Sequence, residues 1–260
     1  MKQRKYSNAL AVLLCVGSLL ISPAYGQESG NSGDWQYSAN IYLWGAGVSG
    51  TAQNGAEIDV SFSDIVSSLD FALMGGIEAR RDRWLLLGDA LYLKIQEDDG
   101  GFIPVAGAPG GGATVAANVT TKSKMLNLAG GYNLVNNESG TLYGIFGARY
   151  LDIDTNLSVA VGGPGPGVVR GIRASGSGWD AVIGIRGNLN LNDKWYLPYH
   201  LDVGAGESDS TWQAVGGVGY KFGWGDVVFA YRHIDWELGS DRVIDQIDFS
   251  GPALQAKWYF

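Results

Sequence analysis

The sequence has 260 residues, of which 46% are hydrophobic, 12% aromatic and only 17% charged, below the roughly 25% charged residues of an ordinary soluble domain. Three of its 18 basic residues and none of its 26 acidic residues lie in residues 1–26, so the remainder carries a net charge of −11. This excludes nucleic-acid binding, which requires a basic surface. The single cysteine, Cys15, also lies in residues 1–26, so disulfides and thiolate metal sites are excluded from the remainder and no cofactor is expected.

Residues 1–26 have the three parts of a secretory signal peptide. The start is basic, residues 9–21 are apolar, and Ala24 and Gly26 are the small residues expected at positions −3 and −1 of a cleavage site. The alternative is a short transmembrane anchor, but the apolar run is too brief to span a bilayer comfortably. We therefore expect export, cleavage after Gly26, and a single domain that fills residues 27–260.

The exported part contains no stretch near 18 consecutive apolar residues, so no membrane helix is expected. Instead, segments of ten to fifteen residues alternate between apolar and polar positions and are separated by clusters of turn-forming residues. They predict ten strands, within a range of eight to twelve. The predicted strands lie near 35–46, 70–81, 83–96, 122–135, 141–155, 177–190, 194–206, 210–223, 226–237 and 244–260.

The connections between these strands alternate in length. Four of them are short and rich in Asp, Asn and Gly, whereas three others, at 47–69, 97–121 and 156–176, are long. An antiparallel membrane barrel has this pattern, with short periplasmic turns and longer outside loops. The pattern predicts both chain ends in the periplasm. In the first long loop, Ser63 and Asp64 precede a predicted helical turn at 65–69.

The aromatic residues distinguish a membrane barrel from a soluble sandwich. Trp212 and Phe222 share one strand face and are ten residues apart, a height of about 25 Å along the membrane normal for a strand tilted by about 40°. No charged residue lies between them on that face, whereas the opposite face carries Thr211, Gln213 and Lys221. A soluble sandwich would place the charged face outside and would not need aromatic rings at both strand ends. The membrane-interface aromatics predicted in this way are Trp84, Tyr92, Tyr132, Tyr150, Trp179, Trp195, Trp212, Phe222 and Trp224.

The last predicted strand carries a pattern typical of a membrane-insertion signal. Leu254, Ala256, Trp258 and Phe260 alternate with more polar residues, and the sequence stops on an aromatic side chain. Barrel-insertion machinery recognises such strands. The expected partners are therefore that machinery, periplasmic chaperones, and the lipopolysaccharide and phospholipid of a Gram-negative outer membrane. No nucleic acid and no specific protein partner is expected.

Several segments resemble a widespread family of uncharacterised outer-membrane β-barrel proteins of Gram-negative bacteria, which is distantly similar to the small outer-membrane barrels and opacity proteins. The matching segments are YLWG at 42–45, VSFSDI at 60–65, GARYLD at 147–152, WD at 179–180, GIR at 184–186, DVG at 202–204, SDSTWQ at 208–213, YR at 231–232, GP at 251–252 and the final Phe260. They span nearly all of residues 27–260. The resemblance implies an integral outer-membrane barrel and brings no established activity.

Charged residues in the strand interiors are expected to face the lumen, because a Lys or Arg facing lipid at mid-depth costs about 2–4 kcal/mol. Four acids, six bases and one histidine predict an ion-paired lumen close to neutral. The predicted lumen network is Glu78, Arg80, Asp89, Arg149, Asp180, Arg186, His200, Asp202, Lys221, Arg232 and Lys257. Asp180 with Arg186 and His200 with Asp202 share strand faces and are its leading members. In a narrow barrel such side chains either fill the lumen or line a thin water path.

Three further motifs carry weaker hypotheses. His200 with Asp202 and His233 with Asp235 each place an imidazole two residues from a carboxylate, as general-base catalysis requires, but no nucleophile accompanies them. The acids gathered at the outer strand ends predict a solvated surface or, alternatively, a cation bridge to lipid phosphates, and their spacing defines no metal site. The glycines at 45–50 match a dinucleotide pattern without the helix that it needs.

The sequence therefore predicts an integral outer-membrane barrel with a structural role or a passive role as a narrow pore for ions or very small solutes. The alternative is a surface binding or adhesion barrel that acts through its long outer loops. A third hypothesis is a hydrolase or lipid-modifying enzyme that uses His200 or His233. We expect no enzyme.

Overall fold

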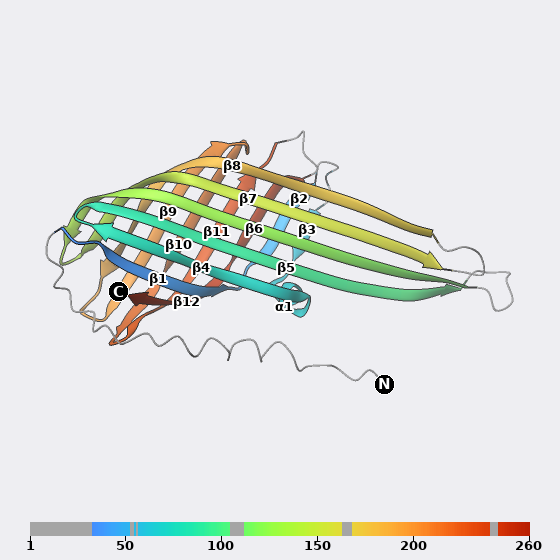
Figure 1. The fold of residues 1–260 in the computed structure, drawn as a ribbon, viewed down its shortest axis with the longest axis horizontal. Helices are drawn as coiled ribbons and strands as arrows, with labels where there is room; N and C mark the ends of the chain where they lie inside the picture. The colour runs from blue at the N-terminus through green and yellow to red at the C-terminus, as the bar shows by residue number, and fades with distance from the viewer. Residues whose placement is uncertain (1–32, 53–54, 56, 105–111, 163–167, 240–243) are drawn as a thin grey trace.

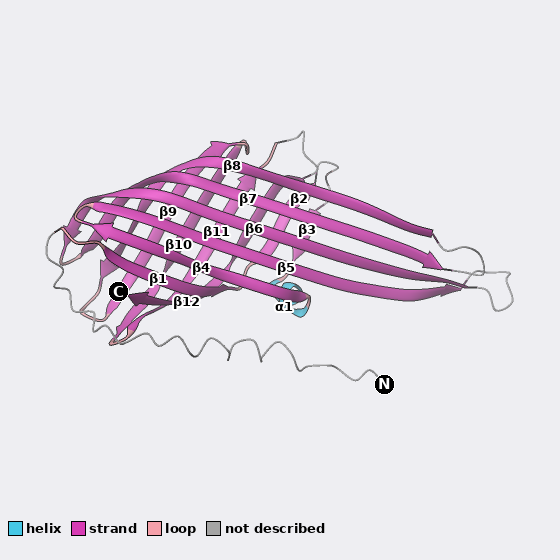
Figure 2. Cartoon of the chain, in the orientation of Figure 1, coloured by secondary structure: helices cyan, strands magenta, loops and turns pink. Residues whose placement is uncertain are grey.

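The computed structural model describes residues 33–52, 55, 57–104, 112–162, 168–239 and 244–260, so the predicted signal peptide lies outside the described residues. Almost all of the described chain is strand, with one short helix (Figure 2). Among the described residues, no helix is long and apolar enough to cross a membrane. The elements are β1 (Gln36–Trp44), β2 (Gly47–Ala52), β3 (Glu57–Val60), α1 (Phe62–Ser67), β4 (Leu69–Arg81), β5 (Trp84–Pro104), β6 (Gly112–Asn137), β7 (Gly140–Gly162), β8 (Val168–Asn190), β9 (Trp195–Gly206), β10 (Ser210–Phe222), β11 (Gly225–Glu237) and β12 (Ile244–Tyr259).

Ten strands form a closed antiparallel barrel, which confirms the predicted fold class. The strands β4 to β12 each pair with the next one along the chain, β1 pairs with β4, and β12 pairs with β1 to close the ring (Figure 1). Closure pairs each of the ten strands on both sides, so most backbone N–H and C=O groups are satisfied within the wall, as a lipid environment demands. The β2–β3 hairpin is an additional element, and its strand β2 pairs with the first half of β12, from Ile244 to Ser250.

The side chains are arranged with the apolar face outward. Leu73, Ile77, Phe146 and Ile183 are each at least 60% exposed and lie on three different strands, whereas Arg149 on the inner face is only 1% exposed. A water-soluble barrel would show the reverse distribution. The period-two alternation of the sequence therefore produces a transmembrane barrel that is apolar toward lipid and polar toward its axis.

The short turns lie together at one end of the barrel, which we call the short-turn end. They are residues 82–83, 138–139, 191–194 and 223–224. In the first of these, Asp82 has a φ of 52°, a left-handed conformation that Asp tolerates better than most residues. The first barrel strand also starts at this end and the last one finishes there, since Tyr37 and Phe260 exchange backbone hydrogen bonds of 3.1 and 3.0 Å.

The predicted loops at 97–121 and 156–176 were wrong for most of their length. Four strands, β5 to β8, continue through them and project beyond the rest of the barrel (Figure 1). The β5–β6 ladder extends as far as the pair Pro104 and Gly112, and the β7–β8 ladder as far as the pair Val161 and Val168. Glycine and alanine made these segments look like loops, but the hairpin pairing extends the strands because each added residue pair gains backbone hydrogen bonds. The hairpin tips at 105–111 and 163–167 lie outside the described residues.

The predicted loop at 47–69 was also wrong, because it contains β2, β3 and α1. The helix begins earlier than predicted, with Ser61 as its N-cap: the Ser61 hydroxyl accepts a hydrogen bond from the Asp64 backbone N–H. The predicted first strand at 35–46 ends at Trp44, and the chain resumes as β2 only at Gly47.

Candidate functional site in the barrel interior

The interior at the short-turn end is filled by tyrosines around a buried carboxylate. Asp226 is 4% exposed and accepts hydrogen bonds from the hydroxyls of Tyr196 at 2.8 Å and Tyr259 at 2.5 Å. The Tyr196 ring lies directly over Gly219 on the neighbouring strand, where even a Cβ atom would be only 2.3 Å from the ring. The glycine is therefore required to let the aromatic ring fill this end of the barrel.

Next to these tyrosines, Glu78 is bound by three cations. Lys257 Nζ lies 2.7 Å and Arg80 Nη2 3.0 Å from the Glu78 carboxylate, and Arg186 donates to its other oxygen. Glu78 is on β4 and Arg186 on β8, which are four strands apart around the ring of ten. This ion pair therefore crosses the interior.

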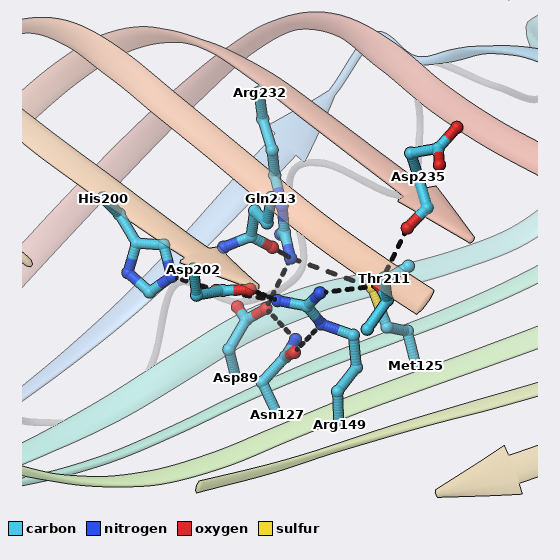
Figure 3. Close-up of polar contacts among 10 residues, drawn as sticks. All are labelled: Asp89, Met125, Asn127, Arg149, His200, Asp202, Thr211, Gln213, Arg232 and Asp235. Atoms are coloured by element: carbon cyan, nitrogen blue, oxygen red, sulfur yellow. Dashed lines mark hydrogen bonds and ion pairs between the residues drawn. The ribbon is translucent and has the colours of Figure 1, made fainter. Parts of the chain in front are cut away.

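The central cluster is built around Arg149 (Figure 3). The Arg149 guanidinium donates to both Asp202 oxygens at 2.6 and 2.7 Å, to Thr211 Oγ1 at 3.0 Å and to Asn127 Oδ1 at 2.8 Å. His200 Nε2 lies 2.5 Å from the same Asp202 carboxylate. Arg149 and Asp202 are 1% and 2% exposed at their side chains. Charges buried this completely need this degree of pairing, because each otherwise loses its hydration without compensation.

A second arginine reaches the same cluster from the opposite wall (Figure 3). Arg232 Nη2 lies 3.2 Å from Asp89 Oδ1 and 3.0 Å from Gln213 Oε1, and Arg232 Nη1 lies 3.1 Å from the Tyr42 hydroxyl. The Asp89 carboxylate also accepts from Asn127 Nδ2 at 3.3 Å. Because Asn127 also binds Arg149, the two arginines belong to one network. Arg232 on β11 and Asp89 on β5 are again four strands apart, so this pair forms a second bridge across the lumen.

An apolar cluster fills the interior beyond this network, toward the end opposite the short turns. Trp236 is 1% exposed and Ile234 is fully buried, and the Arg149 guanidinium lies 5.7 Å from the Trp236 ring. Trp44 lies under the other arginine, 4.7 Å from the Arg232 guanidinium. The members of the cluster are Tyr42, Trp44, Ala46, Met74, Leu91, Met125, Leu151, Ile234, Trp236, Ile247 and Phe249. Charged and apolar layers thus succeed each other along the barrel axis.

The structure places the predicted lumen residues and histidine motifs in different surroundings. Asp180 and Arg186, which share a strand face, do not bind each other: the Asp180 carboxylate accepts from the Ser208 backbone N–H at 2.9 Å, and Arg186 binds Glu78. Lys221 is exposed near the short-turn end, with its ammonium 5.8 Å from the Tyr196 ring. His233 lies on the outer face against Trp212, at 4.5 Å between ring centroids. Of the two His–Asp motifs, only His200 with Asp202 faces the interior.

The uncharged members of the network were not predicted as site residues. Asn127, Tyr42 and Trp44 complete the cluster around the two arginines. Thr211 and Gln213 do so as well, and their position on the strand face opposite Trp212 was the signal that could have identified them. The predicted lumen residues were chosen because they are charged or ionisable. Uncharged hydrogen-bond donors and acceptors could not be found in this way.

The outer aromatic residues lie at both ends of the apolar surface. Trp84 stacks edge-on against Tyr132 at 5.1 Å near the short turns, and Tyr150 lies 4.9 Å from Trp179 near the opposite end. Trp195, Trp212, Phe222 and Trp224 are also exposed, and the Tyr92 ring is 5.9 Å from Phe71. In the last strand, Leu254 and Phe260 are 53% and 65% exposed, and Trp258 lies 5.9 Å from Trp224 on this outer face. Ala256 pairs with Ile41 and Val227 of the two neighbouring strands.

At the end of the barrel opposite the short turns, beyond Tyr150 and Trp179, the predicted acidic surface contains local ion pairs. Arg173 donates a hydrogen bond to Asp154, and this contact lowers the pKa of the Asp154 carboxyl. Asp152 lies 3.6 Å from Lys124 Nζ. Within the described part of the chain, no group of three or more His, Cys, Asp or Glu residues is arranged to hold a metal ion.

No protein-family model matches the sequence, and no curated protein matches it. Solved structures with a similar course of the chain include the outer membrane protease OmpT of Escherichia coli, at 11% identity over 90% of this chain and 99% of that one, with a TM-score of 0.48. The translocator domain of the autotransporter NalP of Neisseria meningitidis is 16% identical over 90% of both chains, with a TM-score of 0.43. The attachment invasion locus protein Ail of Yersinia pestis is 11% identical over 88% of this chain and 100% of that one, with a TM-score of 0.35. The closed strand ladder, the apolar outer face and the polar interior are those of an outer-membrane β-barrel.

Proposed function

We propose that this protein is a structural barrel of the Gram-negative outer membrane whose interior is sealed to solutes. The observation that carries the proposal is the filled lumen. Two ion pairs, Arg186–Glu78 and Arg232–Asp89, cross it, and the cluster around Trp236 lies beyond them. An ion that moved along the axis would have to break these pairs and then enter an apolar layer, where an unpaired charge is strongly disfavoured. The short turns, the start of β1 and the end of β12 face the periplasm in this proposal, as in other barrels with short periplasmic turns.

Conductance across a planar bilayer tests this proposal. We expect the wild-type barrel to give no discrete channel events. A matched pair of variants controls for failed insertion. Replacing Glu78, Arg186, Asp89, Arg232 and Trp236 together by Ala removes both cross-lumen bridges and the centre of the apolar layer and is expected to give measurable conductance, whereas Ile77→Ala on the outer face is expected to stay silent. Gel mobility without heating verifies that each protein is folded. Steady channels from the wild type would contradict the proposal.

A second candidate function, surface binding, is favoured by the projecting strands β5 to β8. On β5, pairing with β4 stops at Ile95, and on β8, pairing with β9 starts only at Asp180. Among the residues that the structure describes, the outer parts of β5 and β8 therefore have no barrel strand on one side. Such free edges are templates for the addition of an extended peptide as a further strand.

Trimming these hairpins at paired residues tests surface binding. Replacing 99–117, between the paired residues Asp98 and Asn118, and 159–170, between Ser158 and Gly171, each by the two-residue turn Asn-Gly shortens both hairpins and keeps the register of the remaining ladders. Peptides selected from a displayed library against the detergent-solubilised wild type are expected to lose binding to the trimmed barrel. Equal binding to both barrels would reject this candidate.

A further inference from the structure

The barrel wall is interrupted between β1 and β4. Their ladder begins with Gln36 paired to Arg80 and ends with Ile41 paired to Gly75. Beyond that point β1 and β2 continue along β12, and β4 continues along β5, without pairing to each other. Leu43 and Leu73 lie at the two sides of this interruption and are 58% and 63% exposed on the outer face.

Helix α1 occupies the interruption and covers it. Ile65 points inward and is only 6% exposed, whereas Phe62 and Val66 are each 46% exposed on the outside. The Phe62 ring lies at the break between β1 and β2, where a Cβ on Gly45 would be 3.4 Å from the ring. Six residues of helix therefore close the wall by side-chain packing, where the rest of the barrel uses strand hydrogen bonds.

Between α1 and the interior apolar cluster lies a cavity of about 190 Å³. Apart from Ser123 and Lys124, each residue that lines it is Ala, Val, Leu, Ile, Met, Phe or Trp. Lys124 is exposed and lies 3.6 Å from Asp152, so it does not present a free charge to a ligand. A cavity of this kind does not hold water, which needs two or more polar partners.

We propose that this cavity is a binding site for an uncharged hydrocarbon group about the size of benzene, entered from the membrane side between β1 and β4. An engineered cavity of about 150 Å³ lined by Leu, Ile and Phe stays dry and binds benzene or xenon, and the cavity under α1 has the same lining chemistry and a similar size. Trp44 and Met125 line it and also touch Arg232, the latter at 3.8 Å between Met125 Sδ and Arg232 Nη2. The site therefore ends where the charged network begins, which excludes a ligand that carries its own charge. The hydrocarbon comes either from a free apolar solute or from the end of a lipid acyl chain.

The methionines provide the measurement. The sequence has three, and the two beyond residue 26, Met74 and Met125, both line the cavity. In the folded barrel labelled with ¹³C-methyl methionine and held in lipid nanodiscs, xenon and benzene are expected to shift both methyl signals in a saturable way. Ala72→Phe, which fills the cavity, is expected to abolish the shifts. Ile77→Phe, on the outer face of the same strand where β4 is paired with β1, is expected to leave them unchanged.

Two further arms keep the test decisive. If Ala72→Phe does not fold, Ile65→Ala enlarges the cavity instead and is expected to admit naphthalene, which the wild type rejects. Cross-relaxation between the two methionine methyls and acyl-chain protons, displaced by benzene, identifies a lipid chain as the occupant, whereas its absence identifies a free solute. The proposal is overturned if neither probe gives a saturable shift in the wild type or in Ile65→Ala and no acyl contact is seen.

Discussion

A carboxylate that binds an arginine inside the barrel has a different energetic role from one that does so outside. Asp202 is buried against Arg149, whereas Asp154 is half-buried beside Arg173, which is 66% exposed. Asp202→Asn would leave the Arg149 guanidinium buried without its counter-charge, which costs about 3–5 kcal/mol in comparable buried pairs. We expect the free energy of unfolding in lipid vesicles, measured by urea titration, to fall by about that amount.

Asp154→Asn is the matched control, because it removes one carboxylate charge beside an arginine that remains in water. Solvent screens such exposed pairs, so we expect no measurable change in the urea midpoint. A similar loss in both variants would mean that burial does not decide how much an arginine–carboxylate pair contributes to the stability of this barrel.

Residue by residue, the sequence predicted which charged side chains face inward but not which partner each one binds. Strand alternation placed Arg149, Asp202 and Arg232 inside, where the structure has them. It gave no partner for Arg186, which binds Glu78 on a strand four places around the ring. Such partners depend on strand number and stagger, which no local pattern contains.

At the scale of elements, α1 owes its position to its cap and to the interruption of the wall. Ser61→Ala removes the hydroxyl that accepts from the Asp64 N–H, and loss of such a cap costs about 1 kcal/mol. We therefore expect hydrogen exchange of the amides of α1 to accelerate about fivefold, measured by NMR in detergent. The amides of β4 in the same sample serve as the control, and equal acceleration there would show that the cap acts on the whole barrel.

Element boundaries were predicted well where turns are compact and poorly where they are long. Asp82 and Arg83 mark the turn between β4 and β5, and the structure turns at these residues. Asp98 and Asp99 resemble a loop because Asp is rare in strands, yet both lie within β5 and pair with β6. Pairing to a neighbouring hairpin overrides local preference, and that pairing is a tertiary effect.

At the scale of the whole molecule, the apolar outer surface dictates the solvent. Residues such as Ile77, Phe146 and Phe229 are 60–66% exposed, and a soluble monomer rarely exposes a continuous apolar band of this kind. We expect the purified barrel to aggregate when detergent is removed and to stay monomeric in micelles, as measured by light scattering during size-exclusion chromatography. A folded monomer in detergent-free buffer would contradict the membrane fold.

The incomplete ladder between β1 and β4 gives the two halves of the barrel different mechanics. Near the short turns, the strand ladder is closed all around the barrel, and its hydrogen bonds together with the ion pairs around Glu78 resist deformation of the barrel wall. Toward the opposite rim, β1 and β4 are not paired, and the side chains of Ile65 and Phe62 lie between their edges. Lateral membrane pressure at this rim should therefore act mainly on the two unpaired strand edges, so that the rim can flex while the short-turn end keeps its shape.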